Sequence, residues 1–135
     1  MAGLLQNTVF GRNKYSPFVS TWNTANTSTG SSTSTQAKLP LVSTGTYAFT
    51  VDWGDGSSNY INVYNQAEVT HTYSVSGTYT ISIKGICTGF SFNNIGDKLK
   101  ILSVTTWGGL KLGSTAAQFQ GCTNLKLTVV TDLFN

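Results

Sequence analysis

The clearest pattern along the chain is an alternation of large apolar residues with polar ones, repeated in several short segments. It is strongest over residues 45–53, where every second residue from Tyr47 to Trp53 is aromatic or β-branched. Residues 18–22 and 78–84 alternate in the same way. Because successive side chains of an extended strand point to opposite faces, each segment has one apolar and one polar face. The pattern therefore predicts β-strands that are buried on one side.

Shorter segments at residues 36–41, 60–64 and 68–73 also favour strands. The first alternates polar with apolar residues, and the other two are rich in aromatic and β-branched residues. Pro40 confines the first of these to a sheet edge or a strand end, because proline has no amide hydrogen to donate. Residues 23–35 are almost all Ser, Thr, Asn, Ala and Gly, which is typical of a loop. Short strands separated by close turns predict an all-β sandwich.

Three strings carry a resemblance to a known family. Residues 51–57 read VDWGDGS, residues 71–73 read HTY and residues 77–81 read GTYTI. The set resembles the PKD domain, whose signature runs W-x-F-G-D-G-S and then H-x-Y-x-x-x-G-x-Y-x-V. The resemblance implies an immunoglobulin-like PKD β-sandwich over residues 18–97, with Trp53 in its core and with His71 helping to build it. It also implies a module for display or adhesion.

A different pattern follows the sandwich signature. Residues 99–104 and 125–130 align with a period of 26 residues, within the range of leucine-rich repeats. Between them, residues 119–125 read FQGCTNL, which is similar to the F-x-x-C-x-x-L repeat of BspA-type leucine-rich proteins. We therefore expect a short leucine-rich-repeat-like β annex over residues 98–135. Such repeats bury a core only by stacking on one another. We therefore expect the apolar edge of this partial repeat to be covered by the sandwich or by a partner subunit.

The two ends of the chain are the predicted docking surfaces. Residues 1–17 contain apolar residues such as Phe10 without a sustained period, which favours an N-terminal arm. At the other end, Leu133 and Phe134 close the partial repeat and are expected to lie at its open edge. Phe10, Leu133 and Phe134 are therefore candidate contacts to another copy of the chain or to another protein.

Charge is sparse in this chain of 135 residues: 10% of the residues are charged, with a formal net charge of +3. Globular proteins typically have about 25%. Alternation on a strand would put Lys98 and Lys100 on one face, and we interpret these and the other scattered lysines as solvated surface residues. A nucleic-acid-binding surface needs a dense basic stripe, so no nucleic-acid partner is predicted.

Cys87 and Cys122 form no metal-binding pattern, and buried free thiols are favoured over one disulfide. The first residues lack the basic and apolar regions of a signal peptide, and no apolar run has membrane-spanning length, so no membrane partner is expected. A display architecture without an export signal suggests a phage structural protein, which is made in the host cytoplasm.

The close carboxylate pair Asp52 and Asp55 has two interpretations. As calcium ligands they would need help from neighbouring hydroxyl and amide oxygens, because calcium takes six to eight oxygens. As turn residues, Asp55 and the glycine after it would shape a hairpin, with the carboxylate accepting backbone hydrogen bonds. The turn is favoured, and no metal or cofactor is predicted. His71 has Ser74 or Asp55 as catalytic partners in principle, but no nucleophile motif accompanies it.

Trp107 is followed by two glycines, so it is the candidate for a surface aromatic that stacks on a sugar. An inward-facing Trp107 is an equal alternative. Together these features predict a non-enzymatic structural or display protein of a bacteriophage virion, as a capsid decoration or a tail or fibre component. Its partners would be other virion proteins, copies of itself and a host surface glycan. The alternative is a bacterial cell-surface adhesion module that binds glycan or protein, and a secreted glycan-active enzyme ranks third.

Overall fold

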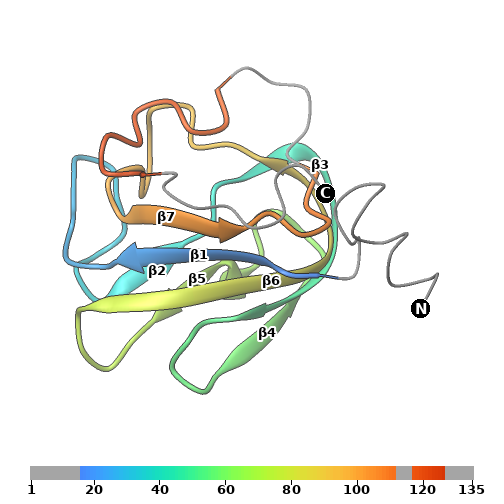
Figure 1. Cartoon of the computed structure of the whole chain (residues 1–135), viewed down its shortest axis with the longest axis horizontal. Helices are drawn as coiled ribbons and strands as arrows, with labels where there is room; N and C mark the ends of the chain where they lie inside the picture. Colours follow the sequence, from blue (N-terminus) through green and yellow to red (C-terminus); the bar gives the residue numbers. More distant parts are fainter. Residues whose placement is uncertain (1–15, 112–116, 127–135) are drawn as a thin grey trace.

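A computed structural model describes residues 16–111 and 117–126 of the chain. Within these residues nearly all regular structure is β-strand, as the alternation predicted (Figure 1). The elements in order are β1 (Phe18–Asn23), β2 (Gln36–Lys38), β3 (Leu41–Asp52), β4 (Ser58–Ile61), the 3-10 turn η1 (Ala67–Val69), β5 (Thr70–Thr72), β6 (Thr78–Phe90) and β7 (Ile101–Thr106).

The strands form two sheets. The large sheet has the order β4-β3-β6-β1-β7, and the small sheet pairs β2 with β5. Every pair of neighbouring strands runs antiparallel. Figure 1 shows the small sheet behind the large one. Ala37 of β2 belongs to the same buried core as Trp22 and Phe49 of the large sheet. The architecture is an all-β sandwich.

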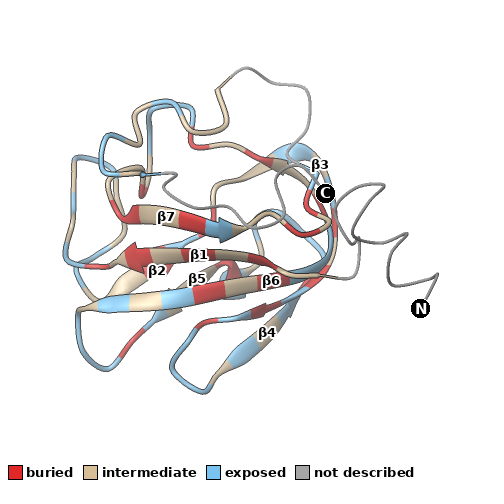
Figure 2. Ribbon diagram, in the orientation of Figure 1, coloured by how far each residue is buried: buried red, intermediate tan, exposed pale blue. Residues whose placement is uncertain are grey.

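The core follows the predicted alternation. Trp22 of β1 and Trp53 after β3 are fully buried, each with 0% of its surface exposed. Along the strands of the large sheet, buried positions alternate with more exposed ones (Figure 2). Ser20 is a buried polar residue on the same side of β1 as Trp22, and its Oγ accepts a hydrogen bond of 2.8 Å from Trp22 Nε1. The indole and the hydroxyl therefore satisfy each other inside the core.

Strand ends differ from prediction where side chains or glycines intervene. The predicted strand at residues 60–64 ends at Ile61, because the Gln66 side chain holds a turn there: Gln66 Oε1 accepts from the amides of Asn62 (2.8 Å) and Val63 (3.1 Å). In contrast, β6 runs on beyond the predicted residue 84 to Phe90. Gly85, at φ +128°, lets β6 approach the backbone of β3 closely.

The large sheet continues through the point where a separate annex was expected to begin. β7 lies beside β1, with Thr21 opposite Ser103 and Trp22 opposite Ile101. The hydroxyls of Thr21 and Ser103 also share a hydrogen bond of 2.5 Å. The first strand of the predicted repeat is thus an integral strand of the sandwich.

Residues 117–126, here called the stacked unit, run beside the turn that precedes β7 (Figure 1). Backbone hydrogen bonds of 2.8 Å join Phe92 N to Gln118 O and Asn94 N to Gln120 O. The stacked unit ends in a parallel bridge between Ser103 and Lys126. The 26-residue alignment had put Lys100 opposite Lys126, so the actual strand register is shifted by three residues.

Candidate functional site

The acidic glycine turn closes the hairpin between β3 and β4. Asp52 Oδ1 accepts a hydrogen bond of 2.9 Å from the Gly54 amide, and Asp55 Oδ1 accepts one of 3.1 Å from the Ser57 amide. Gly54 has a φ of +85°, and a Cβ there would collide with the Thr80 carbonyl of β6. The role predicted for Asp55, a carboxylate that holds its own turn, is confirmed by this geometry.

His71 connects this turn to the small sheet. Its Nε2 lies 2.8 Å from Asp55 Oδ2, and its ring stacks on Trp53 at 4.8 Å between centroids and 8° between planes. Tyr73, two residues further along the chain, packs edge-on against His71 and donates a hydrogen bond of 2.8 Å to the Trp53 carbonyl. Because β5 carries His71, the cluster fastens one layer of the sandwich to the other.

The same cluster brings Asp55, Ser57 and His71 together, but not as a catalytic triad. Ser57 Oγ and Asp55 Oδ2 both approach the same nitrogen, His71 Nε2, at 3.3 Å and 2.8 Å. Ser57 Oγ donates a hydrogen bond of 2.5 Å to Asp55 Oδ1. In a triad the carboxylate and the nucleophile occupy opposite nitrogens of the imidazole, which then takes the serine proton. Here the carboxylate is the acceptor, so the arrangement fixes a turn.

The pKa of Asp55 reflects these contacts. Partial burial by itself would raise the pKa, but the hydrogen bonds from Ser57 and His71 and the charge of His71 outweigh it and lower the pKa to about 2. Asp55 is therefore ionised over the whole physiological range, as a turn-holding acceptor must be.

Asp52 and Asp55, the two residues suggested as calcium ligands, belong to different parts of this network. Both oxygens of Asp55 accept hydrogen bonds from neighbours in the turn or from His71. Among the residues that the structure describes, no group of three or more histidine, cysteine or acidic side chains is placed to hold a metal ion. The turn accounts for the positions of both carboxylates.

Trp107 follows β7 and is half-buried. Its ring centroid lies 5.7 Å from that of Phe18 in β1 and 5.8 Å from that of Phe119 in the stacked unit. This position favours the inward-facing alternative, in which Trp107 joins the sandwich core to the stacked unit. The other predicted contact residues, Phe10, Leu133 and Phe134, lie outside the described residues.

A buried ion pair between Asp97 and Lys100 escaped the sequence analysis. Lys100 is 0% exposed and Asp97 is 2% exposed. Lys100 Nζ donates to Ser32 Oγ (2.8 Å), Thr33 O (2.6 Å) and Gln36 O (2.7 Å), and lies 3.9 Å from Asp97 Oδ2. Burial lowers the pKa of Lys100, and the charge of Asp97 opposes this effect.

The Asp97 carboxylate completes the same network. Its Oδ1 accepts from the Ser32 amide at 2.7 Å, and its Oδ2 accepts from Ser32 Oγ at 2.6 Å and from the Lys38 amide at 2.7 Å. The pair therefore ties the Ser/Thr-rich loop and β2 to the turn before β7. The sequence held one indication of this pair: an acid and a lysine three residues apart, followed directly by the apolar residues Ile101 and Leu102 of β7.

The prediction that Lys98 and Lys100 share one solvated face was wrong. β7 begins only at Ile101, so both lysines lie in the preceding turn and strand alternation does not apply to them. Lys98 is half-exposed and donates to Asn94 O at 3.0 Å, whereas Lys100 points inward. Oxygen atoms of the Ser/Thr-rich loop and of Gln36 at the start of β2 supply the hydrogen-bond acceptors that a buried ammonium requires.

Both cysteines are free thiols, as favoured above. Cys87 is buried and Cys122 is half-buried. Burial raises the pKa of Cys87 to about 12 and that of Cys122 to about 11. Both thiols therefore stay protonated at neutral pH and are unsuited to act as nucleophiles.

No helix in the described part of the chain has both the length and the apolar character needed to cross a membrane. Comparisons with protein-family models, with curated proteins and with solved structures find no match for this chain. The strand topology establishes the all-β sandwich. The PKD-like and leucine-rich-repeat resemblances stay predictions from the sequence strings.

Proposed function

We propose that this chain is a non-enzymatic structural or display protein of a bacteriophage virion that docks to its neighbours through the stacked unit and the N-terminal arm. The observation that carries the proposal is the placement of residues 117–126. They extend the sandwich alongside β7, where Lys126 N donates a 2.9 Å hydrogen bond to Leu102 O. A parallel, repeat-like edge of this kind is suited to continued stacking on another polypeptide.

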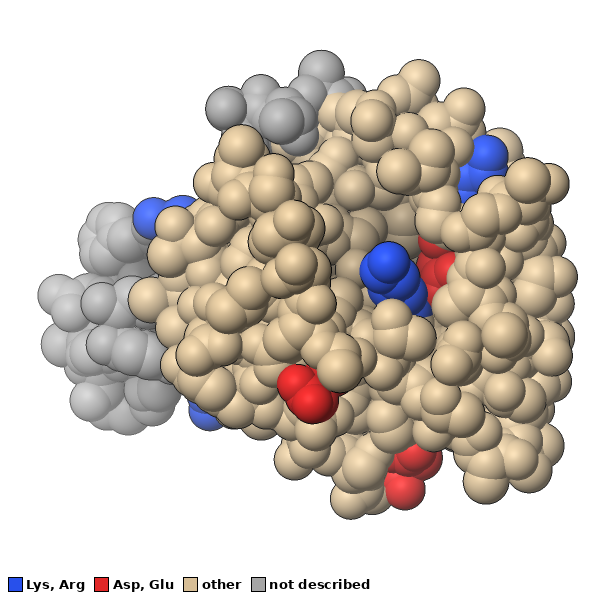
Figure 3. Space-filling view, turned by 180° about the vertical axis from the view of Figure 1, so that it is seen from behind, with Lys and Arg blue, Asp and Glu red and all other residues tan. Residues whose placement is uncertain are grey.

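The surface supports a role in display. Exposed positions on the strands of the large sheet are rich in threonine, as at Thr50, Thr80 and Thr105. Figure 3 shows the face opposite to that of Figure 1, on which acidic and basic side chains are few and uncharged residues cover most of the surface. A polar surface with little charge suits a protein that is exposed on a particle and packed against neighbours.

The chemistry of the turn also supports a structural role. Asp55, Ser57 and His71 are the residues that would make a hydrolytic centre, and their hydrogen bonds instead hold the β3–β4 turn against β5. In this proposal the cluster stabilises the sandwich, and the surfaces perform the function.

Mass spectrometry of purified virions tests the proposal. The chain should be present at a fixed ratio to the major capsid protein through successive density gradients. Abundant host cytoplasmic proteins serve as the control, because their ratio to the major capsid protein should decrease with each gradient. If the chain falls away together with them, the virion assignment is wrong.

A bacterial cell-surface adhesion module is the second candidate, and an open cavity beside Lys38 and Tyr64 favours it. Surface biotinylation of intact bacterial cells distinguishes the two. An adhesion module would be labelled on the outside of uninfected cells, whereas a virion protein would be absent from them.

A further inference from the structure

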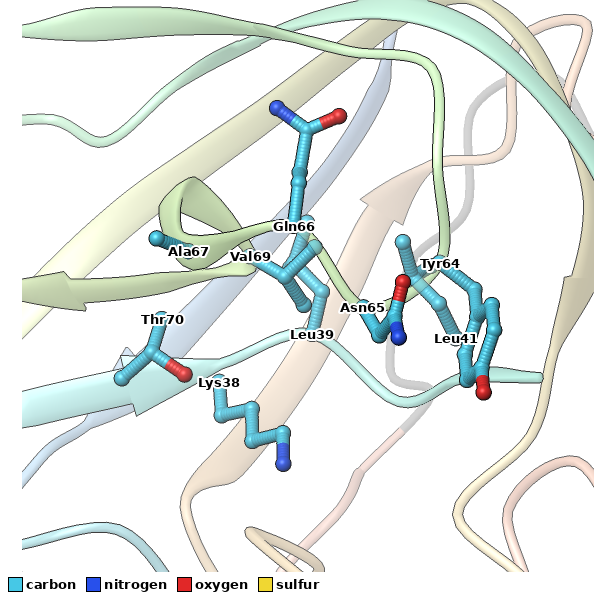
Figure 4. A pocket seen from close by; sticks show the side chains of 9 residues that line it. All are labelled: Lys38, Leu39, Leu41, Tyr64, Asn65, Gln66, Ala67, Val69 and Thr70. Carbon is cyan, nitrogen blue, oxygen red and sulfur yellow. The ribbon is translucent and has the colours of Figure 1, made fainter. Parts of the chain in front are cut away.

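A cavity of about 280 Å³ opens between the β2–β3 connection and the segment that leads into β5 (Figure 4). Its lining combines aliphatic, aromatic and polar side chains: Lys38, Leu39, Leu41, Tyr64, Asn65 and Thr70. Ligand sites typically have this composition, with an apolar surface and a few polar groups that fix orientation.

Lys38 supplies the charge of the cavity. It is exposed, and among the described residues its Nζ makes no hydrogen bond or ion pair. Among the described residues that line the cavity, Lys38 is the only one with a charged side chain. The nearby Asp97 carboxylate binds the Lys38 amide and is neutralised by Lys100. The cavity therefore presents a net positive charge, held by a flexible side chain at its rim.

Tyr64 supplies an apolar surface. It is 39% exposed, and it lies next to Leu41 on the side of the cavity across from Lys38 (Figure 4). Asn65 lies between Lys38 and Tyr64 in the same view, and its amide offers both a donor and an acceptor. The Gln66 side chain extends away from Lys38, because its amide already binds Tyr60 O at 3.0 Å.

We propose that this cavity binds an acidic sugar, a hexuronate-type unit of a surface polysaccharide. The apolar face of the pyranose ring packs on Tyr64 and Leu41, and the carboxylate forms a charge-assisted hydrogen bond with Lys38 Nζ. The Asn65 amide and the Thr70 hydroxyl bind ring hydroxyls. The site is distinct from Trp107, and its existence does not depend on whether the chain is part of a virion.

An NMR titration of the intact chain with D-glucuronate tests the proposal, with D-glucose as the neutral comparison. Glucuronate should shift the amide resonances of residues 38, 65 and 70 with a Kd of about 1 mM. Glucose should bind at least about tenfold more weakly. Lys38→Met and Tyr64→Ala should each weaken glucuronate binding by about tenfold, a loss of about 1.4 kcal/mol.

Two matched variants serve as controls. Lys84→Met removes an exposed lysine of β6, and Tyr60→Ala removes a tyrosine of β4 that is 58% exposed; neither residue lines the cavity. Both should bind glucuronate like the unmodified chain. The proposal is overturned if glucuronate leaves the three amides unshifted, if glucose binds equally well, or if Lys38→Met binds as tightly as Lys84→Met.

Discussion

Two acid–base side-chain pairs lie in contrasting environments in this sandwich. Asp55 and His71 meet near the surface, with 25% and 15% of their side chains exposed, whereas Asp97 and Lys100 are almost completely buried. A partly hydrated pair contributes modestly to stability. In a buried pair, loss of one partner leaves the other charge unpaired in the low-polarity interior, which lowers the free energy of unfolding more strongly. The two pairs should therefore respond very differently to substitution.

Asp55→Asn should lower the free energy of unfolding at pH 7 by about 1 kcal/mol, because the turn loses a charged acceptor. The folded pKa of Asp55 is lowered from 3.8 to about 2, so its contribution is complete above the unfolded value and disappears as the pH falls through the folded value. The difference between the two proteins in urea unfolding should thus shrink between about pH 4 and pH 2. A difference that stays constant over this interval would contradict the role of the carboxylate.

Lys100→Met should lower the free energy of unfolding by about 3 kcal/mol, because Asp97 is left buried without its counter-charge. Lys84→Met is the control: Lys84 is exposed on β6, so its change should stay within about 0.5 kcal/mol. Urea unfolding monitored by tryptophan fluorescence measures both. Equal effects of the two substitutions would show that Lys100 is not the buried partner described here.

These residues also mark what the sequence could predict. The role of Asp55 was predictable because its partners in the turn are its immediate neighbours, and turn chemistry is local. The role of Lys100 was not, because its acceptors Ser32 and Gln36 precede it by 68 and 64 positions. Only the folded chain brings this hydroxyl and this carbonyl to the ammonium.

At the scale of elements, strand positions follow from the alternation of side chains, but strand ends do not. The centres of β1, β3 and β6 were predicted from their apolar faces. The end of β4 depends on Gln66, and the length of β6 depends on its contact with β3, where Thr46 pairs with Thr88. Both are tertiary features that a local pattern does not contain.

The stacked unit also depends on a tertiary contact, the close approach of Gly121 to Asn94. Gly121 has a φ of +85°, and a Cβ there would collide with Asn94 in the neighbouring turn. Gly121→Ala should therefore loosen the stacked unit and speed hydrogen exchange at the amides of Phe92 and Lys126, which bond across the stack.

Gly30→Ala is a matched control for this substitution. Gly30 has nearly the same φ, +84°, but a Cβ there meets nothing within 4 Å. Both variants carry the strain of a left-handed backbone, of about 1–2 kcal/mol. Only Gly121→Ala adds the collision with Asn94. Equal exchange at Phe92 and Lys126 in the two variants would show that the stack does not depend on this close approach.

At the scale of the whole molecule, the all-β fold class was predicted correctly. The pairing of β7 with β1 in the large sheet was not predicted. Alternating strands and close turns were sufficient to indicate an all-β sandwich. The pairing of β7 with β1 joins strands about 80 residues apart, as in the contact of Thr21 with Ser103, and no local pattern encodes it. The result is a single large sheet with the stacked unit along its edge.

We propose that this edge docks the chain into a virion. Thr123 is exposed on the stacked unit, and Thr78 is exposed at the start of β6 on the large sheet. Arginine at either position should be tolerated by the fold, because both side chains face solvent.

Quantitative mass spectrometry of virions assembled with each variant is the most direct measurement. We predict that the unmodified chain and Thr78→Arg are incorporated at the same fixed ratio to the major capsid protein, and that Thr123→Arg is reduced about tenfold or more, as expected for a lost contact worth at least 1.4 kcal/mol. Absence of the unmodified chain from virions, or equal incorporation of Thr123→Arg and Thr78→Arg, would contradict the account.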